Sequence, residues 1–288
     1  LIVPFRAPKS AKIYKDLWTE KGSPIIYHTH DLCEKLKNVL GNDYHVEYAM
    51  RYKNPSLKKT LESWEGKNFK QIIILPLFPH YASATNGSVI EEAMDVIKKW
   101  WVIPELSFVS QFYNEEFYLK GFEEKGNAHD FKEYDHILFS FHGLPERHVD
   151  KVYKDGLCKD NDCEHGINDE NVFCYKATCY ETAIQLAKRF KLKEEDYTVG
   201  FQSRLGRGWI EPFSDEIIVD LAKKGAKKLL VFSPAFVADC LETIIEIGDE
   251  YQELFEEHGG EKVQLVESLN SSDTFVHGLK EMILKRSL

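Results

Sequence analysis

Short runs of apolar and β-branched residues recur along the chain, and most of them do not alternate with polar residues. Gln71–Leu77 and Lys228–Ser233 show this continuous pattern, which is typical of strands buried on both faces of a sheet. Five further runs of similar length also predict strands. They are His45–Met50, Leu106–Gln111, Asp135–Phe141, Tyr197–Gln202 and Val263–Val266.

Segments with a helical spacing of apolar residues separate these runs. The alternation of strand and helix predicts parallel sheets with helices on both faces. The stretch Asn114–Glu133 is polar and charged, and we interpret it as a crossover between two halves of the chain. We therefore expect one α/β domain at residues 1–126, a second at 127–270, and a C-terminal helix within 271–288. The predicted helices are Asn86–Trp100, Tyr175–Phe190, Ser214–Lys224, Val237–Phe255 and Asp273–Arg286.

Composition and charge narrow the classes of function. The 288 residues are 43% hydrophobic and 29% charged, which supports a packed core and argues against disorder. The formal net charge of −10 should repel phosphate backbones, so nucleic acid is not an expected partner. No apolar run approaches the ~20 residues of a spanning helix, and we recognise no signal peptide. We expect a cytoplasmic protein whose contact with membranes is at most peripheral.

Side chains suited to ligand binding follow the predicted strands. In open parallel sheets, ligands bind beyond the carboxyl ends of the strands. The sequence contains neither the glycine-rich dinucleotide fingerprint nor a P-loop, so no nucleotide cofactor is expected. The candidate residues at the strand ends are Phe78–Ser83, His142–Pro145, Ser203, Arg204, Trp209, Asp239 and Glu242.

One histidine and three glutamates have the spacing of a metal or proton site. His142 directly follows a buried strand, and a neutral imidazole can ligate iron or accept a proton near neutral pH. Glu242, Glu246 and Glu250 are four residues apart and so share one face of a predicted helix. Like charges at this spacing repel by ~0.2–0.5 kcal/mol per pair, and a cation or protons would offset this. A loop histidine without a role and a solvated helix face are the alternative readings.

Several motifs occur together in a fixed order and resemble the ferrochelatase family. The resemblance extends from about Pro4 to the C-terminus, with Arg51-Tyr52, Pro55 and Gly22-Ser23-Pro24 similar to early family segments. The motifs are Phe78–Thr85, Ser140–Pro145, Phe201–Arg204, Trp209 and Asp239–Thr243.

The resemblance implies a fold and a set of site residues. It implies two Rossmann-like domains, each a parallel sheet flanked by helices, with a porphyrin cleft between them. His142 and Glu242 would be the catalytic pair that handles the Fe²⁺ substrate, and Glu246 and Glu250 would continue from it as an acidic line. The residues expected to bind porphyrin are Arg51, Tyr52, Phe78, Tyr81, Ser83 and Trp209.

The function implied is insertion of Fe²⁺ into protoporphyrin IX to give protohaem. Insertion requires a distorted ring, acceptors for its pyrrole protons, and iron stripped of water, which an aromatic cleft with an imidazole–carboxylate pair can supply. Because this porphyrin is apolar, we expect lipid contact near the cleft mouth. The alternatives are a chelatase for cobalt or coproporphyrin, a non-catalytic porphyrin or haem carrier, and an iron–sulfur regulatory module. A porphyrin or haem carrier would have no use for a row of glutamates, which argues against that alternative.

Family members usually begin with a strand and a Gly-Thr-Pro turn. This chain begins at Leu1 without them, so we expect the first strand of the N-terminal domain to be missing.

Four cysteines lie close together within residues 151–179. Cys158 and Cys163 repeat the spacing of Cys174 and Cys179, which suits a metal site in a reducing compartment better than a disulfide scaffold. The spacing alone leaves an iron–sulfur cluster, a zinc site and unliganded thiols open. The segment resembles an insertion in some bacterial ferrochelatases, which favours a [2Fe–2S] cluster. Cys240 stands where some members have a second histidine, and Cys33 is isolated.

Overall fold

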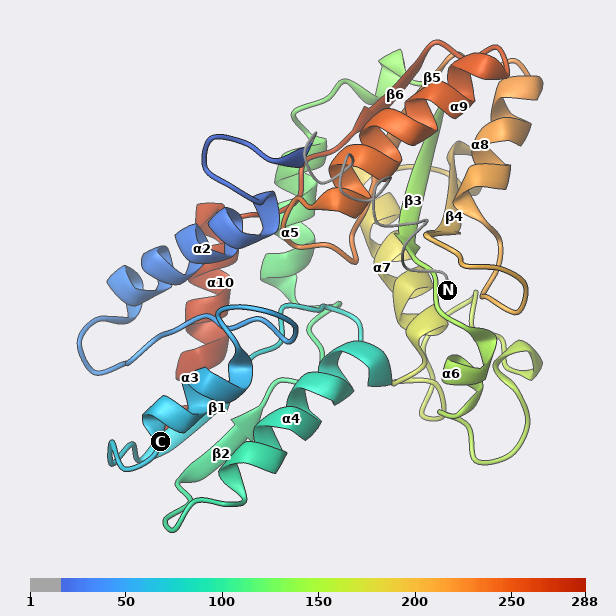
Figure 1. Ribbon diagram of the computed structural model, residues 1–288. Helices are drawn as coiled ribbons and strands as arrows, with labels where there is room; N and C mark the ends of the chain where they lie inside the picture. The colour runs from blue at the N-terminus through green and yellow to red at the C-terminus, as the bar shows by residue number, and fades with distance from the viewer. Residues whose placement is uncertain (1–16) are drawn as a thin grey trace, which may run out of the picture. The chain divides into compact units, whose positions relative to one another are not determined.

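The computed structural model describes residues 17–288 (Figure 1). These residues form two compact units, and each unit draws on several segments of the chain. The first unit comprises residues 17–29, Gly121–Glu146 and Thr182–Asn270, and the second comprises His30–Lys120, Arg147–Glu181 and Ser271–Leu288.

The first unit contains a four-stranded parallel sheet in the order β4-β3-β5-β6. Its register pairs Ile137 with Tyr197 and with Leu230, and all three strand pairs are parallel. The central strand β3 is buried along most of its length, as its continuous apolar run predicts. The strands are β3 (His136–His142), β4 (Tyr197–Gln202), β5 (Lys228–Phe232) and β6 (Lys262–Leu265).

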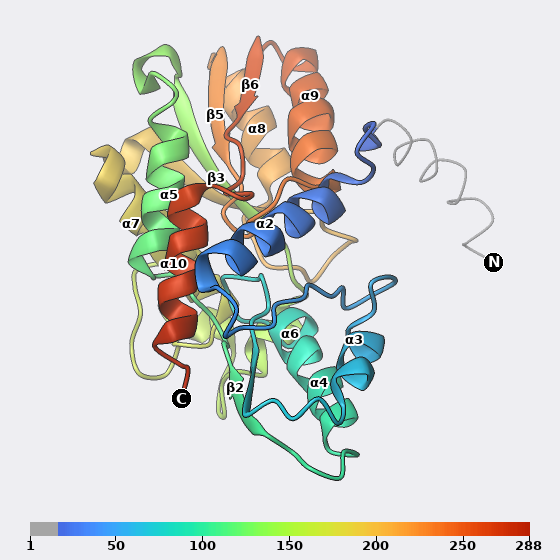
Figure 2. The same cartoon turned by 90° about the vertical axis from the view of Figure 1, so that its left-hand side faces the viewer.

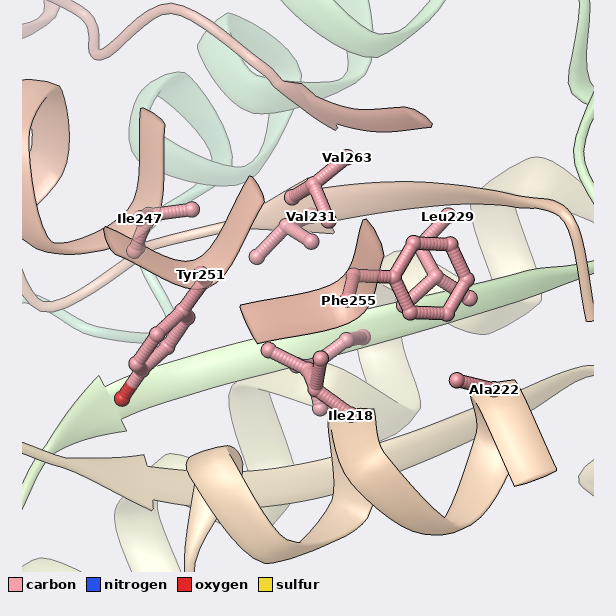
Figure 3. Close-up of a cluster of buried hydrophobic side chains, with 9 residues drawn as sticks. Ile218, Ala222, Leu229, Val231, Ile247, Tyr251, Phe255 and Val263 are labelled. Carbon is pink, nitrogen blue, oxygen red and sulfur yellow. The ribbon is translucent and has the colours of Figure 1, made fainter. Parts of the chain in front are cut away.

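Helices cover both faces of this sheet (Figure 2). On one face, α8 (Ser214–Lys223) lies beside α9 (Tyr251–Glu257), which continues the π-helix η5 (Glu242–Glu250). Their apolar side chains pack with those of the strands in one buried cluster (Figure 3). The end of α7 (Tyr175–Phe190) lies on the other face, where Phe190 is 5.3 Å from the ring of Phe232. Two short 3₁₀ turns, η2 (Phe131–Glu133) and η4 (Glu194–Asp196), precede β3 and β4.

The second unit contains a two-stranded parallel sheet with helices packed against it. Strand β1 (Gln71–Ile74) pairs with β2 (Glu105–Phe108), and Ile72 lies opposite Leu106. The core of this unit lies between the sheet and helices α3 and α4. The boundaries between the units fall within α2, α5, α6 and α7 and just before α10. The remaining elements are α2 (Pro24–Leu40), α3 (Leu57–Trp64), η1 (Ser83–Gly87), α4 (Ser88–Ile97), α5 (Glu116–Gly126), α6 (Glu146–Asp150), η3 (Cys158–Asp160) and α10 (Asp273–Leu284).

The structure confirms the predicted fold class and most predicted elements, but three differ. His45–Met50 forms no strand, because none of its side chains is buried, and only Met50 makes an isolated bridge. The stretch Asn114–Glu133 is not polar throughout, since it contains α5, whose Tyr118 and Phe122 are buried, although the chain does pass from one unit to the other within it. The helix expected at Val237–Phe255 begins only at Leu241, because Asn270 binds the preceding backbone at Val237 and Asp239.

No helix within residues 17–288 has both the length and the apolar character to cross a bilayer. The expectation of a missing first strand concerns the start of the chain and lies outside the described residues.

Candidate functional site

His142 is the last residue of β3, and a tight turn holds its backbone in place. Its Nδ1 lies 2.7 Å from the carbonyl oxygen of Gly143. A neutral imidazole that donates from Nδ1 carries its lone pair on Nε2, so Nε2 is the basic nitrogen. The ring is partly buried, with the ring of Phe236 at 6.1 Å. A base of this kind can accept a proton or ligate a metal ion.

The turn after β3 requires glycine and draws in Trp209. The Gly143 amide donates to the carbonyl of Gln202 at 2.7 Å. A Cβ on Gly143 would lie 2.8 Å from that oxygen and 3.2 Å from the Trp209 ring, so any other residue would displace one of them. An isolated bridge between Pro145 and Trp209 fixes the tryptophan beside the histidine turn.

Gln202 links the histidine strand to the glutamate helix. It lies opposite His142 in the sheet register and is 1% exposed. Its Oε1 accepts from the hydroxyl of Ser140 at 2.8 Å, and its Nε2 donates to the carbonyl of Glu242 at 3.1 Å. Nε2 also lies 3.1 Å from Glu246 Oε2. The side-chain amide of Gln202 therefore holds the backbone at Glu242, and its main-chain carbonyl accepts from the amide that follows His142. The sequence contained this residue in a motif, but nothing in it indicated this role.

The three glutamates of η5 have different environments. Glu242, at its start, is partly buried, and Glu250, at its end, is exposed. The carboxylate of Glu246 accepts from the Ser203 amide at 2.7 Å and from the Ser203 hydroxyl at 2.5 Å. Tyr251 adds a longer contact of 3.4 Å, and burial raises the pKa of Tyr251, so its hydroxyl stays protonated. The Glu246 carboxylate is thus held in place, and it links η5 to the end of β4.

The residues expected to bind porphyrin lie in two groups. Trp209 belongs to the first unit, whereas the other five belong to the second. Arg51 is held by the Ser88 hydroxyl at 2.6 Å and Glu92 at 3.2 Å, and its guanidinium lies 4.8 Å from the Tyr52 ring. Because Ser88 begins α4 directly after η1, these contacts bring Arg51 beside the segment that follows β1. That segment carries Phe78, Tyr81 and Ser83.

The second-unit aromatics are accessible. Tyr52 is 70% exposed and Phe78 is 38% exposed, so both can meet a ligand. Tyr81 is partly buried, with its ring 5.5 Å from Phe173, and Ser83 is exposed at the start of η1.

Three of the four clustered cysteines come together, and the fourth does not. The sulfurs of Cys158, Cys163 and Cys174 lie 3.6–3.7 Å from one another, and all three side chains are buried. Hydrogen bonds from the other two thiols lower the pKa of Cys174. The Tyr153 hydroxyl lies 2.9 Å from Cys163 Sγ. Cys179 is outside this group and fully buried, and burial raises its pKa.

The two cysteines that were expected to stand apart are also buried. Cys33 contacts the carbonyl of Val46 at 3.9 Å. The backbone amide of Cys240 donates to the Thr243 hydroxyl at 2.9 Å. Neither belongs to the three-cysteine group among the described residues.

Solved chelatases share this fold. SirB from Bacillus subtilis with Fe³⁺ superposes with a TM-score of 0.60 at 13% identity, over 93% of this chain and 90% of that chain. CbiX, the terminal enzyme for biosynthesis of siroheme in denitrifying bacteria, superposes with a TM-score of 0.55 at 14% identity, over 93% and 95%. The fold is therefore the two-domain Rossmann-like α/β fold that these chelatases have.

Sequence comparison identifies the family. The pattern of the ferrochelatase family matches residues 1–287. A ferrochelatase of Legionella pneumophila (strain Lens) is 42% identical over 284 residues, which cover 98% of this chain and 84% of that protein. One of Coxiella burnetii (strain Dugway 5J108-111) is 38% identical, over 99% and 80%. The chain belongs to the ferrochelatase family, whose members insert metal into a tetrapyrrole.

Proposed function

We propose that this chain inserts ferrous iron into protoporphyrin IX and so produces protohaem. The observation that carries the proposal is the link through Gln202, which holds the backbones next to His142 and at Glu242. An imidazole and a carboxylate on elements that one buried residue holds together are a suitable pair for a metal ion and the protons that it displaces.

His142 and Glu242 have different roles in the proposed reaction. Nε2 of His142 accepts a pyrrole proton, because Nδ1 already donates to Gly143. Glu242, partly buried at the start of η5, binds the iron or relays a proton. Glu246 takes no mobile part, because its carboxylate is engaged by Ser203. Glu250 supplies negative charge at the exposed end of the helix, which attracts cations.

Aromatic side chains and one cation are the proposed porphyrin contacts. Tyr52, Phe78 and Trp209 offer ring faces, and burying them against a porphyrin would provide binding energy for ring distortion. Arg51 is the only cation among the six expected residues. A single arginine suits protoporphyrin better than coproporphyrin, which carries more carboxylates.

The test is anaerobic incubation of the protein with each metal and each porphyrin in turn. Fe²⁺ with protoporphyrin should produce haem absorption faster than Co²⁺ with protoporphyrin or Fe²⁺ with coproporphyrin. Faster turnover with coproporphyrin or with cobalt would show that the proposed pair of substrates is wrong. Tight porphyrin binding without turnover on any pair would instead identify a carrier.

Two finer expectations remain proposals alongside this function: the domain limits at residues 126 and 270, and a cytoplasmic protein with peripheral lipid contact. The expected [2Fe–2S] cluster on Cys158, Cys163, Cys174 and Cys179 fits the structure poorly, because only the first three sulfurs group together among the described residues.

A further inference from the structure

The three grouped cysteines form a triangle with the dimensions of a mononuclear metal site. Their sulfur–sulfur distances are 3.7, 3.6 and 3.7 Å. For a tetrahedral ion with the usual zinc–sulfur bond of ~2.3 Å, the edge of the sulfur tetrahedron is ~3.8 Å. These separations are also far longer than a disulfide bond of ~2.05 Å, and all three cysteines are free. The triangle therefore matches three vertices of one tetrahedron.

We propose that Cys158, Cys163 and Cys174 bind a single Zn²⁺-type ion through their three thiolates, and that the hydroxyl of Tyr153 donates a hydrogen bond to the Cys163 thiolate. Tyr153 Oη lies 2.9 Å from Cys163 Sγ, which is a hydrogen-bond distance. Soft thiolates in a tetrahedral arrangement are the donor set that selects zinc or iron–sulfur centres.

The position of Cys179 distinguishes a zinc site from an iron–sulfur cluster. A [2Fe–2S] cluster uses four protein ligands, two on each iron, so thiolates on different irons lie farther apart than those on the same iron. Here all three sulfurs are equally close. Cys174 directly precedes α7, and five helical positions rotate Cys179 by about 140° from it.

The surrounding loop is ordered by its own hydrogen bonds. The Cys158 amide donates to Asp150 at 2.9 Å, and Asn171 donates to the Gly166 carbonyl at 2.9 Å. Lys176 pairs with Glu164 at 2.6 Å across the opening of the site. A hollow of about 330 Å³, lined by residues 158–165 and Lys176, reaches Cys158 and Cys163 and provides an entry path.

Metal analysis of the purified protein tests the stoichiometry. We expect one zinc per chain and no acid-labile sulfide. Two irons and two sulfides per chain would overturn the proposal, and so would a chain that takes up neither Zn²⁺ nor Co²⁺ after reduction.

Cobalt substitution tests the ligands by a signal that is independent of activity. The Co²⁺ protein should show thiolate-to-cobalt charge-transfer bands and the visible bands of a tetrahedral ion. Cys163→Ser should lose about a third of the charge-transfer intensity or the metal itself, whereas the matched Cys179→Ser should retain the full intensity. Tyr153→Phe should retain the metal and shift the charge-transfer bands, because the Cys163 thiolate loses a hydrogen bond. Loss of metal in a folded Cys179→Ser variant, or an unshifted Tyr153→Phe spectrum, would refute the proposed site.

A separate surface of the second unit carries a second inference. In the loop between α4 and β2, Trp101 is 98% exposed, Val102 is 75% exposed and Ile103 is 52% exposed. Consecutive exposed apolar residues of this size are unusual on a protein in water and mark an interaction site.

Basic residues surround this loop at the same edge of the sheet. Lys98 and Lys99 lie at the start of the same loop, with Lys98 in an ion pair with Asp95, and Lys67 lies on the loop before β1, the parallel neighbour of β2. The Lys70 carbonyl accepts from the Glu105 amide at 3.1 Å, which brings the two loops together. An exposed tryptophan with lysines beside it is the composition of segments that lie in the headgroup region of anionic bilayers.

We infer that the Trp101–Ile103 loop inserts into the surface of an anionic membrane. The protein should float with phosphatidylglycerol-containing vesicles and not with pure phosphatidylcholine, and added salt should release it. Each neutralised lysine, such as Lys67→Gln, should weaken partitioning about fivefold. Trp101→Ser should abolish flotation, whereas Trp18→Ser, at an exposed tryptophan elsewhere, should not. Equal flotation of these two variants, or concentration-dependent dimers that Trp101→Ser disrupts, would overturn the inference.

Discussion

Replacing Gln202 by methionine is the sharpest test of how this site is held together. Methionine has a similar length but neither accepts from Ser140 and Ser233 nor donates to Glu242 and Glu246. In the native protein, Gln202 makes these four hydrogen bonds while 1% exposed. The substitution should therefore disturb the link between the histidine strand and η5 without creating a large cavity.

The magnitude follows from which partners lose their contacts. Ser140 keeps its contact with Ser214 at 2.8 Å, and Glu246 keeps both contacts with Ser203. The Ser233 hydroxyl and the Glu242 carbonyl lose the bonds to Gln202. Each buried polar group left unsatisfied costs ~1–3 kcal/mol, so we expect a stability loss of about 2–4 kcal/mol. A shift of about 1 Å at Glu242 should lower kcat by ~10–100-fold.

Two measurements check this prediction. Urea unfolding gives the stability change, and initial rates of haem formation under anaerobic conditions separate kcat from KM for porphyrin. KM should change little, because Gln202 is too buried to contact porphyrin. Gln264→Met is a matched control, since Gln264 makes a single bond, to the neighbouring Leu265 carbonyl at 2.9 Å. If Gln202→Met keeps normal kcat while the protein is destabilised, the amide supports only the fold.

Three further predictions concern individual side chains. His142→Ala should abolish metal insertion while porphyrin binding, measured by fluorescence quenching, persists; near-normal turnover would make it a loop histidine. Glu242→Gln should reduce turnover strongly, Glu246→Gln should chiefly lower the unfolding midpoint, and Glu250→Gln should have the smallest effect. Equal, negligible effects of all three would show that these glutamates are only the solvated face of η5. Burial lowers the pKa of His80 to about 3, below its ordinary value of 6.5. The unfolded state therefore binds the extra proton, and stability should fall by ~1.4 kcal/mol per pH unit as pH drops below 6.5 towards 3. Urea titrations at pH 6.5 and 5 should show this slope, and His80→Phe should reduce it.

The elements that depend on local pattern were predictable from the sequence. Tyr197–Gln202 and Tyr175–Phe190 have the same limits in the structure as in the prediction, because each is a single uninterrupted pattern. The apolar run before His142 required a strand buried on both faces, and that placed the histidine at a carboxyl end.

Segments whose pattern is mixed were decided by tertiary contacts. Asn114–Glu133 has many charges, yet Tyr118 and Phe122 find a core to pack against, so α5 forms. His45–Met50 has strand-like composition, but no neighbouring strand is available to pair with it. The helix of the glutamates starts at Leu241 because Asn270, about thirty positions away, holds the chain before it.

The candidate site shows the same division. Residue type and order along the chain made His142, the glutamates and the cysteines candidates, and the resemblance to the family supplied their expected roles. Only the folded chain shows that Glu246 is tied down by Ser203 and that Cys179 lies apart from the other three thiols. Such distinctions depend on where a side chain points and on which distant residue meets it, and one-dimensional spacing carries neither.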